Sequence, residues 1–187
     1  MRIVAGKYGS RHLKSPGSLR LRPTSDRLRE TLFDILGPAV AGSLFVDAYA
    51  GTGAVGIEAL SRGARRVIFI EIARGAVLLI RRNLEALGAA DGAEIVHDDA
   101  RRALARLEAR GECADLLFLD PPYEDEEEYR RALELLSHSA PLARTGAIVF
   151  EHRATLPLPD FLGQLESFRR VRQGDACLTF FRLIPGR

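Results

Sequence analysis

The sequence predicts an α/β protein whose sheet is mostly parallel and is covered by helices on both faces. From about residue 43 onward, short apolar runs alternate with segments in which apolar residues recur at helical spacing. The apolar runs are continuous rather than alternating, which is typical of parallel strands that are buried on both faces. The last two predicted strands are joined only by Gly174-Asp175, and so tight a connection requires an antiparallel pair. The expected fold is therefore a series of strand–helix units that ends in an antiparallel strand pair.

A small extension precedes this alternation. Residues 2–14 predict two short strands around a turn at 7–10, and Pro16-Gly17 interrupts the pattern. A helix is expected to begin near 24–26, where each of the three residues could cap it. Gly37-Pro38 should stop that helix. The extension is thus expected to be a hairpin followed by one helix.

Seven strands and four further helices follow from the apolar pattern. The strands are expected at 44–46, 67–70, 94–96, 116–119, 147–150, 167–173 and 176–183. The first of the helices should span about 54–62, and the others should carry three sets of apolar residues: Val77, Ile80, Leu84 and Leu87, which share one face; Ala100, Ala103, Leu104 and Leu107; Tyr129, Leu133 and Leu136.

Composition excludes several classes of protein. The chain has 187 residues, of which 47% are hydrophobic, so one ordinary core is expected. No apolar run reaches 18 residues and the first residues lack the apolar stretch of a signal peptide, so a cytoplasmic protein without membrane spans is expected. Cys113 and Cys177 are expected to be reduced packing residues in apolar surroundings. Four scattered histidines without paired cysteines predict no metal site.

Positive charge is concentrated at the start of the chain. Residues 1–30 carry eight basic and two acidic side chains, a net charge of +6, whereas the whole chain carries only +2. Such a leader is typical of an arm that binds a polyanion, although a solvated tail would look similar. We therefore expect a basic arm at 1–22 and one main domain at 23–187. The candidate RNA-binding residues of the arm are Arg2, Lys7, Arg11, Lys14, Arg20 and Arg22.

A glycine-rich loop follows the first strand of the main domain. Gly51, Gly53 and Gly56 match the G-x-G-x-x-G spacing that lets a backbone turn sharply and approach a cofactor closely. Glu71 ends the next strand, 20 residues beyond Gly51, where an acid can accept hydrogen bonds from ribose hydroxyls. This pattern alone fits NAD and adenosyl cofactors equally, and a glycine turn that only packs remains an alternative.

Acidic residues at successive strand ends favour one cofactor. Asp47 lies four residues before Gly51, where a carboxylate suits a cationic amino-acid group and would repel a pyrophosphate. Asp99 follows the third strand, where it could accept a hydrogen bond from an adenine amino group or simply cap a helix. These positions fit S-adenosylmethionine, which has one adenosine, one zwitterionic tail and no phosphate.

Asp120-Pro121-Pro122-Tyr123 directly follows the buried run 116–119. Ligands of open α/β sheets bind outside the carboxyl ends of the strands, so this segment should face a ligand. A carboxylate beside an aromatic ring suits a planar base that carries an exocyclic amine, because the ring can stack on the base while the acid accepts its N–H groups. The alternative is a turn with an exposed aromatic side chain.

Taken together, these motifs resemble those of the Rossmann-like class I methyltransferases. The segments 2–7, 21–33 and 56–64 are further similar to the bacterial RsmD family. That resemblance implies methyl transfer from S-adenosylmethionine to the guanine N2 of one nucleotide in small-subunit (16S) ribosomal RNA. It also implies that Asp47, Gly51 and Gly53 line the methionine and adenosine side, that Glu71 binds the ribose, that Asp99 and the Ala100 backbone bind the adenine, and that Asp120, Pro121, Pro122 and Tyr123 face the guanine.

Three other functions remain open at this point. A DNA adenine or cytosine amino-methyltransferase can use the same tetrapeptide, but 187 residues leave little room for a target-recognition domain. An NAD-dependent oxidoreductase would need a hydride-transfer acid or base, and no suitable histidine or lysine is evident. A non-catalytic RNA-binding module is the third alternative. We expect a monomer that acts on ribosomal RNA within a small-subunit particle, and we assign no role to the last 35 residues.

Overall fold

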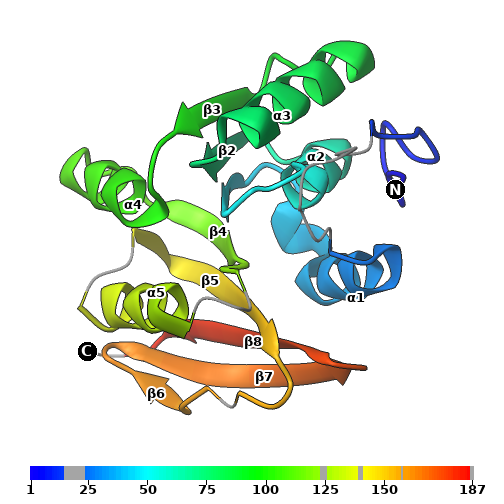
Figure 1. Ribbon diagram of the computed structural model, residues 1–187. Helices are drawn as coiled ribbons and strands as arrows, with labels where there is room; N and C mark the ends of the chain where they lie inside the picture. Colours follow the sequence, from blue (N-terminus) through cyan, green and yellow to red (C-terminus); the bar gives the residue numbers. More distant parts are fainter. Residues whose placement is uncertain (15–23, 123–125, 139–140, 157, 186–187) are drawn as a thin grey trace. The chain divides into compact units, whose positions relative to one another are not determined.

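The computed structural model describes residues 1–14, 24–122, 126–138, 141–156 and 158–185 (Figure 1). The chain divides into two compact units, Met1–Ala100 and Arg101–Arg187. The predicted boundary between arm and main domain, at residues 22–23, lies outside the described residues.

The first unit contains a three-stranded parallel sheet in the order β3-β2-β1. Its elements are α1 (Asp26–Leu36), the 3-10 helix η1 (Gly37–Val40), β1 (Leu44–Ala48), α2 (Ala54–Ser61), β2 (Arg66–Glu71), α3 (Arg74–Leu87) and β3 (Ala93–His97). From residue 24 onward, each strand and helix predicted for this unit is present. The strands begin up to one residue earlier and end up to two residues later than the sequence predicts, because flanking residues such as Asp47, Arg66 and His97 also pair.

Local signals explain where these helices begin and end. The Ser25 side chain caps α1 by accepting a hydrogen bond from the Leu28 amide at 3.1 Å. Gly37 ends that helix, as predicted, and Gly88 ends α3 in the left-handed conformation. The predicted apolar face of α3 is buried, with Ile80 fully covered. The helical spacing thus identified the correct face.

The N-terminal segment, residues 1–14, differs from its prediction. It turns back on itself, with the Ile3 amide donating to the Arg11 carbonyl and the Ser10 amide to the Ile3 carbonyl at 3.0 and 2.9 Å. Only an isolated antiparallel bridge joins Arg2 to His12, so the two predicted strands do not form. The reason is that several backbone amides of the segment donate instead to side chains and carbonyls of α2.

The second unit combines one parallel and several antiparallel pairings. Its elements are α4 (Ala100–Ala109), β4 (Ala114–Leu119), α5 (Glu126–His138), β5 (Leu142–Arg153), β6 (Phe161–Leu162), β7 (Leu165–Gln173) and β8 (Ala176–Leu183). The strand order is β4-β5-β8-β7-β6, in which β4 and β5 are parallel and the other neighbours antiparallel. The predicted antiparallel C-terminal pair is confirmed.

Two predictions for this unit were incomplete. The described residues contain eight strands rather than seven, because the two-residue strand β6 is too short to leave a pattern in the sequence. Strand β5 begins at Leu142 rather than 147, because the exposed and polar Arg144 and Thr145 interrupt the apolar pattern near its start. The cysteine prediction was also only half right: Cys177 is buried, but Cys113 is exposed. Over the described segments, no helix combines the length and apolarity needed to span a bilayer.

Candidate functional site

The parallel register of the first unit brings acidic residues to one edge of its sheet. Ala48 of β1 pairs with Ile70 of β2, and Glu71 of β2 pairs with His97 of β3, so the three strands end at the same level. Asp47, Glu71 and the Asp98-Asp99 pair therefore share one edge, as predicted. The glycine loop starts from this edge.

The glycine loop holds a compact and strained backbone. Tyr49 has a φ of +66°, and Gly51 has a φ of +54°. A left-handed conformation costs a residue with a Cβ roughly 1–2 kcal/mol, so Tyr49 is held there by its surroundings. Backbone hydrogen bonds supply part of this restraint: the Ala50 amide donates to the Ile70 carbonyl at 2.9 Å, and the Gly53 amide to the Ala50 carbonyl at 2.7 Å. Such strained positions are typical of ligand-binding loops.

Glu71 joins this loop to the segment after β2. One carboxylate oxygen accepts a hydrogen bond from the Gly51 amide at 2.7 Å, and the other accepts one from the Ala73 amide, also at 2.7 Å. Glu71 is buried to 8% exposure. A carboxylate has about four acceptor positions, so two of them remain for ribose hydroxyls. The predicted ribose contact stays a prediction, and the observed role of Glu71 is to fix the loop.

Asp47 has a more internal position than the sequence suggested. Its side chain is only 1% exposed, and its Oδ2 accepts a hydrogen bond from the Gly56 amide in the first turn of α2 at 2.8 Å. A carboxylate at a helix N-terminus is stabilised by the free amides and by the helix dipole. This geometry gives Asp47 a role in shaping the loop, while its predicted contact with the cofactor stays a prediction.

The end of β3 supplies the remaining predicted cofactor residues. Asp98 accepts a hydrogen bond from the Asp99 amide at 2.8 Å, and Ala100, the first residue of α4, is buried. The His97 ring lies 3.0 Å from the Ile72 carbonyl, which links the segments after β2 and β3. His97 thus makes a structural contact of the kind expected for an isolated histidine at a strand end.

The residues of this edge fit an adenosyl cofactor. A Cβ built on Gly51 would meet only the Tyr49 carbonyl oxygen, at 3.9 Å, so the backbone there is open to a close ligand. The acidic side chains suit hydroxyl, amino and ammonium groups and would disfavour phosphates. Within the described part of the chain, no group of three acidic, histidine or cysteine side chains is arranged to hold a metal ion.

The second unit presents the predicted target segment. Asp120 directly follows β4 and is half-buried, Pro121 is buried and Pro122 is exposed. Tyr123 lies outside the described residues. Asp120 therefore stands at the carboxyl end of a parallel strand, as the sequence predicts.

Strand β5 adds buried polar residues that the sequence analysis did not select. Leu119 pairs with Phe150, so Glu151 and His152 continue β5 beyond the end of β4. Both side chains are at most 4% exposed. The His152 Nε2 lies 2.8 Å from the Thr179 hydroxyl, and burial lowers the pKa of His152. A charged residue directly after an apolar strand is the signal that could have identified Glu151.

The predicted RNA-binding residues are partly described. Arg2, Lys7, Arg11 and Lys14 are exposed residues of the N-terminal segment, whereas Arg20 and Arg22 lie outside the described residues. The Arg11 guanidinium donates to the Ala86 carbonyl at 3.0 Å, at the C-terminal end of α3. This contact fixes the course of the segment.

Comparison with known proteins matches this chain over nearly its whole length. The model of the family described as Conserved hypothetical protein 95 matches residues 1–182. The YlbH protein of Bacillus subtilis is 35% identical over 182 residues, which cover 97% of this chain and 98% of the relative. Ribosomal RNA small subunit methyltransferase D of Escherichia coli K12 is 40% identical over 123 residues, or 66% of this chain and 60% of the relative.

A solved structure has the same fold. The yhhF protein from Escherichia coli superposes with a TM-score of 0.83 at 29% identity, and the match covers 98% of this chain and 97% of that one. The fold prediction of an α/β, Rossmann-like architecture with antiparallel C-terminal strands is confirmed.

Proposed function

Since the chain belongs to the family described as Conserved hypothetical protein 95, which is the RsmD family of the sequence resemblance, we propose that it methylates small-subunit ribosomal RNA. The methyl donor is S-adenosylmethionine, and the acceptor is the exocyclic N2 amine of one guanine. The observation that carries the proposal is the position of Asp120-Pro121-Pro122 directly after β4, in a chain of this family. That segment offers a carboxylate and a backbone carbonyl, which can accept hydrogen bonds from the amine of a nucleobase. Hydride transfer does not use such a pair of acceptors.

Residues of the first unit would hold the cofactor. Glu71 would accept hydrogen bonds from the ribose hydroxyls, and Gly51 would let the backbone approach the ligand. Gly53 would line the same site by letting the loop pack closely on α3, since a Cβ there would meet the Ile80 side chain at 3.0 Å. Asp99 and the Ala100 amide would bind the adenine, and Asp47 would keep the loop in shape beneath the methionine end. The fixed backbone of the loop supports this assignment, because its strain and hydrogen bonds preorganise it.

S-Adenosylmethionine supplies a methyl group attached to a sulfonium, which is a good leaving group. The contribution of this chain is to prepare the nucleophile. The guanine amine is weakly nucleophilic because its lone pair is delocalised into the ring. Its two N–H groups would donate hydrogen bonds to the Asp120 carboxylate and the Pro121 carbonyl. These hydrogen bonds would direct the lone pair of the amine nitrogen toward the methyl group. The prolines hold this geometry because their φ is preset.

Tyr123 would position the base. Stacking of an aromatic side chain on a base is worth roughly 1–3 kcal/mol. Together with the hydrogen bonds to Asp120 and Pro121, stacking would orient the amine and the methyl group for in-line transfer, which is the main catalytic effect that we propose. As the new N–C bond forms, the methyl–sulfur bond breaks and the sulfur leaves as a neutral thioether, and the amine loses one of its two protons.

The basic side chains of the N-terminal segment would contact RNA phosphates. Arg2, Lys7, Arg11 and Lys14, with Arg20 and Arg22, are the residues that we assign to this contact. Deletion of residues 1–20 would be a poor test, because Ile3, Tyr8 and Leu13 belong to the core of the first unit. Substitution of Lys7 and Lys14 by alanine should instead reduce the slope of log affinity against log salt by about 0.7–0.9 per lost phosphate contact.

The experiment that tests the function is methyl transfer to defined substrates. Purified protein is incubated with labelled S-adenosylmethionine and with unmodified small subunits, free 16S ribosomal RNA or DNA, and methylated guanines are mapped by mass spectrometry. We expect one N2-methylguanine in ribosomal RNA, most strongly in the assembled particle. Labelled DNA without labelled RNA would refute the proposal in favour of a DNA amino-methyltransferase.

A variant pair separates the chemistry from cofactor binding. Asp120→Ala should abolish transfer but leave the S-adenosylmethionine dissociation constant within a few-fold. Asp91→Ala, at an exposed aspartate in the loop before β3, is the matched control and should remain active. Turnover retained in Asp120→Ala would exclude the role that we give this carboxylate.

A further inference from the structure

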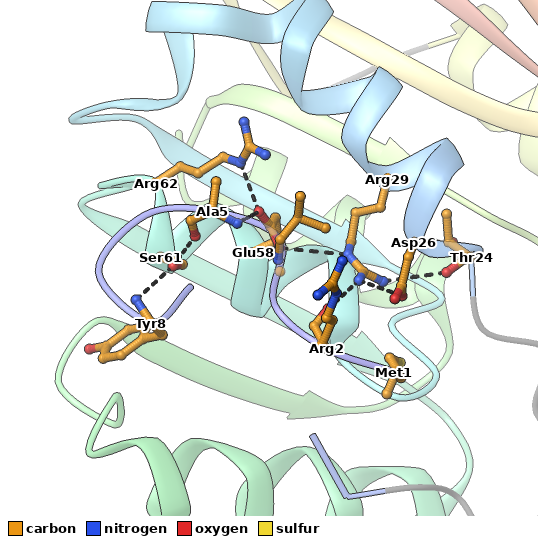
Figure 2. A network of polar contacts seen from close by, with 12 residues as sticks. Met1, Arg2, Ala5, Tyr8, Thr24, Asp26, Arg29, Glu58, Ser61 and Arg62 are labelled. Atoms are coloured by element: carbon orange, nitrogen blue, oxygen red, sulfur yellow. Dashed lines mark hydrogen bonds and ion pairs between the residues drawn. The ribbon is translucent and has the colours of Figure 1, made fainter. Parts of the chain in front are cut away.

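A buried carboxylate outside the cofactor edge organises the start of the chain. Glu58 lies in α2, five residues after Gly53, and is completely buried. Figure 2 shows it at the centre of a polar network that joins α2, α1 and the N-terminal segment. Its oxygens accept hydrogen bonds from the Val4 amide at 2.7 Å, the Ala5 amide at 3.0 Å and the Arg62 Nε at 2.8 Å.

Arg29 of α1 completes this network from the opposite side. Its side chain is also fully buried, and its Nε lies 3.7 Å from a Glu58 oxygen. The same guanidinium donates to the Arg2 carbonyl, to the Thr24 carbonyl at 3.4 Å and to Asp26 at 2.9 Å. Arg29 therefore binds the main chain both at Arg2 and at Thr24, just before α1 (Figure 2).

The last turn of α2 holds the next residues of the segment. The Ser61 carbonyl accepts a hydrogen bond from the Lys7 amide at 2.7 Å, and the Ser61 hydroxyl contacts the Tyr8 amide and the Ala5 carbonyl at 2.9 and 2.5 Å. A Cβ on Gly6 would overlap the Ser61 carbonyl oxygen, so the two backbones touch at this point. Residues 4–8 are thus bound to α2 through their main chain.

In this arrangement the charged side chains of the N-terminal segment are exposed to solvent. The main-chain groups and the buried Ile3 and Tyr8 make the contacts with the protein, whereas Arg2 and Lys7 are exposed. Thr52 of the glycine loop also contacts the Met1 sulfur at 3.5 Å. The segment is therefore a fixed part of the first unit, next to the loop that we assign to the cofactor, and differs from the flexible tail that its composition also allowed.

Such a buried ion pair requires a reason. Removal of a carboxylate from water is costly, and an apolar cluster of similar volume often stabilises a protein equally well. An apolar side chain, however, cannot bind two successive backbone amides and so cannot fix the register of a segment. A segment fixed in advance loses less conformational entropy when its side chains bind a ligand.

We infer that Glu58 is a positioning residue for RNA: it holds the N-terminal segment in place so that Arg2, Lys7 and Arg11 present a preformed basic surface. This inference rests on the proposed function, since it gives that function a preorganised RNA contact. Loss of the carboxylate should release the segment and weaken RNA binding without changing the cofactor loop.

The test uses Glu58→Gln in the full chain. The amide keeps the shape of the side chain but replaces one acceptor oxygen by a donor, which would face a backbone amide. Hydrogen exchange should increase at least tenfold in peptides from residues 1–13 and remain within twofold in peptides from β2. The KM for small subunits should rise about tenfold, while kcat and the S-adenosylmethionine dissociation constant stay within threefold.

Two further variants keep the test decisive. Glu85→Gln removes the same charge from an exposed position of α3 and should change none of these quantities. Ser61→Ala removes a second anchor of the segment and should give the same pattern more weakly if Glu58→Gln fails to fold. Unchanged exchange, or faster exchange with an unchanged KM, would overturn the inference. A wild-type protein without methyl transfer would contradict the proposed function instead, and hydrogen exchange would still show whether Glu58 holds the segment.

Discussion

Replacement of Gly56 by alanine tests how closely α2 must approach the sheet to carry the glycine loop. A Cβ at this position would lie 2.9 Å from two ring carbons of Phe69 and closer still to a third, whereas ordinary van der Waals contact begins at 3.4 Å. The helix would have to move by more than about 0.5 Å, because the two farther ring carbons alone require that much, and the fully buried Phe69 ring has no room to withdraw. The same movement would lengthen the hydrogen bond from the Gly56 amide to Asp47.

The expected cost follows from two opposing terms. Overpacking of a core costs about 1–3 kcal/mol, and loss of a buried hydrogen bond adds about 1 kcal/mol. Alanine is favoured over glycine in a helix by about 1 kcal/mol, which offsets part of this loss. We expect Gly56→Ala to lower the free energy of unfolding by about 1–3 kcal/mol in urea titrations, and to weaken S-adenosylmethionine binding because α2 begins directly after Gly53.

A second substitution identifies the cause. In Gly56→Ala with Phe69→Leu, the smaller side chain removes the ring that alanine would strike. The double variant should therefore lose less stability than the sum of the two single variants, with a coupling of about 1 kcal/mol or more. If Gly56→Ala is as stable as the wild type, or if the two losses simply add, the close approach of α2 to Phe69 does not limit this position.

Three further predictions concern individual side chains. Tyr129→Phe should leave the free energy of unfolding unchanged or raise it by up to about 1 kcal/mol, because the buried hydroxyl has no hydrogen-bond partner among the described residues. A decrease of more than about 1 kcal/mol in the free energy of unfolding would contradict this. Burial lowers the pKa of His152, so the unfolded chain takes up the proton at a higher pH than the folded chain does, and the free energy of unfolding should fall as the pH drops below about 6.5. The urea midpoint of His152→Gln should depend less on pH in that range than the wild-type midpoint does. Equal dependence would exclude His152 as the source. Glu71→Gln should weaken S-adenosylmethionine binding about tenfold by calorimetry, since the glutamine side chain has one acceptor oxygen and can accept from only one of the Gly51 and Ala73 backbone amides. Unchanged affinity would show that the second hydrogen bond is dispensable.

The sequence was most informative where one residue pattern determines one structural feature. The buried stripe of α3 and a cap within residues 24–26 could be predicted because helical spacing and capping are local properties, although the sequence did not single out Ser25 among the three candidates. The acidic strand ends could be located because parallel strands in register end at one edge of a sheet. The main-chain role of Asp47 could not be predicted, since nothing in the sequence says that α2 turns its first amides toward that carboxylate.

Ion pairs between residues far apart in the sequence could not be predicted either, because the sequence does not show which elements pack together. Arg29 was counted among the eight basic residues of a leader expected to bind a polyanion, yet it is fully buried against Glu58, 29 positions later. A signal did exist on the other partner: Glu58 is the single charged residue in α2, a helix whose residues are otherwise almost all buried and uncharged. A lone charge in an apolar helix needs a buried counterpart, but the sequence does not identify which arginine provides it.

Three buried carboxylates of the first unit bind the protein's own main chain. Asp47, Glu58 and Glu71 each accept at least one backbone amide, and each amide belongs to a segment that must keep a particular path: the start of α2, the N-terminal segment and the glycine loop. A hydrogen bond from a backbone amide to a carboxylate fixes the position of the main chain, whatever side chain the residue with that amide carries. The glycine loop and the basic segment can therefore be held rigidly while their exposed groups stay available to the cofactor and the RNA of the proposed function, which is the condition that transfer by positioning requires.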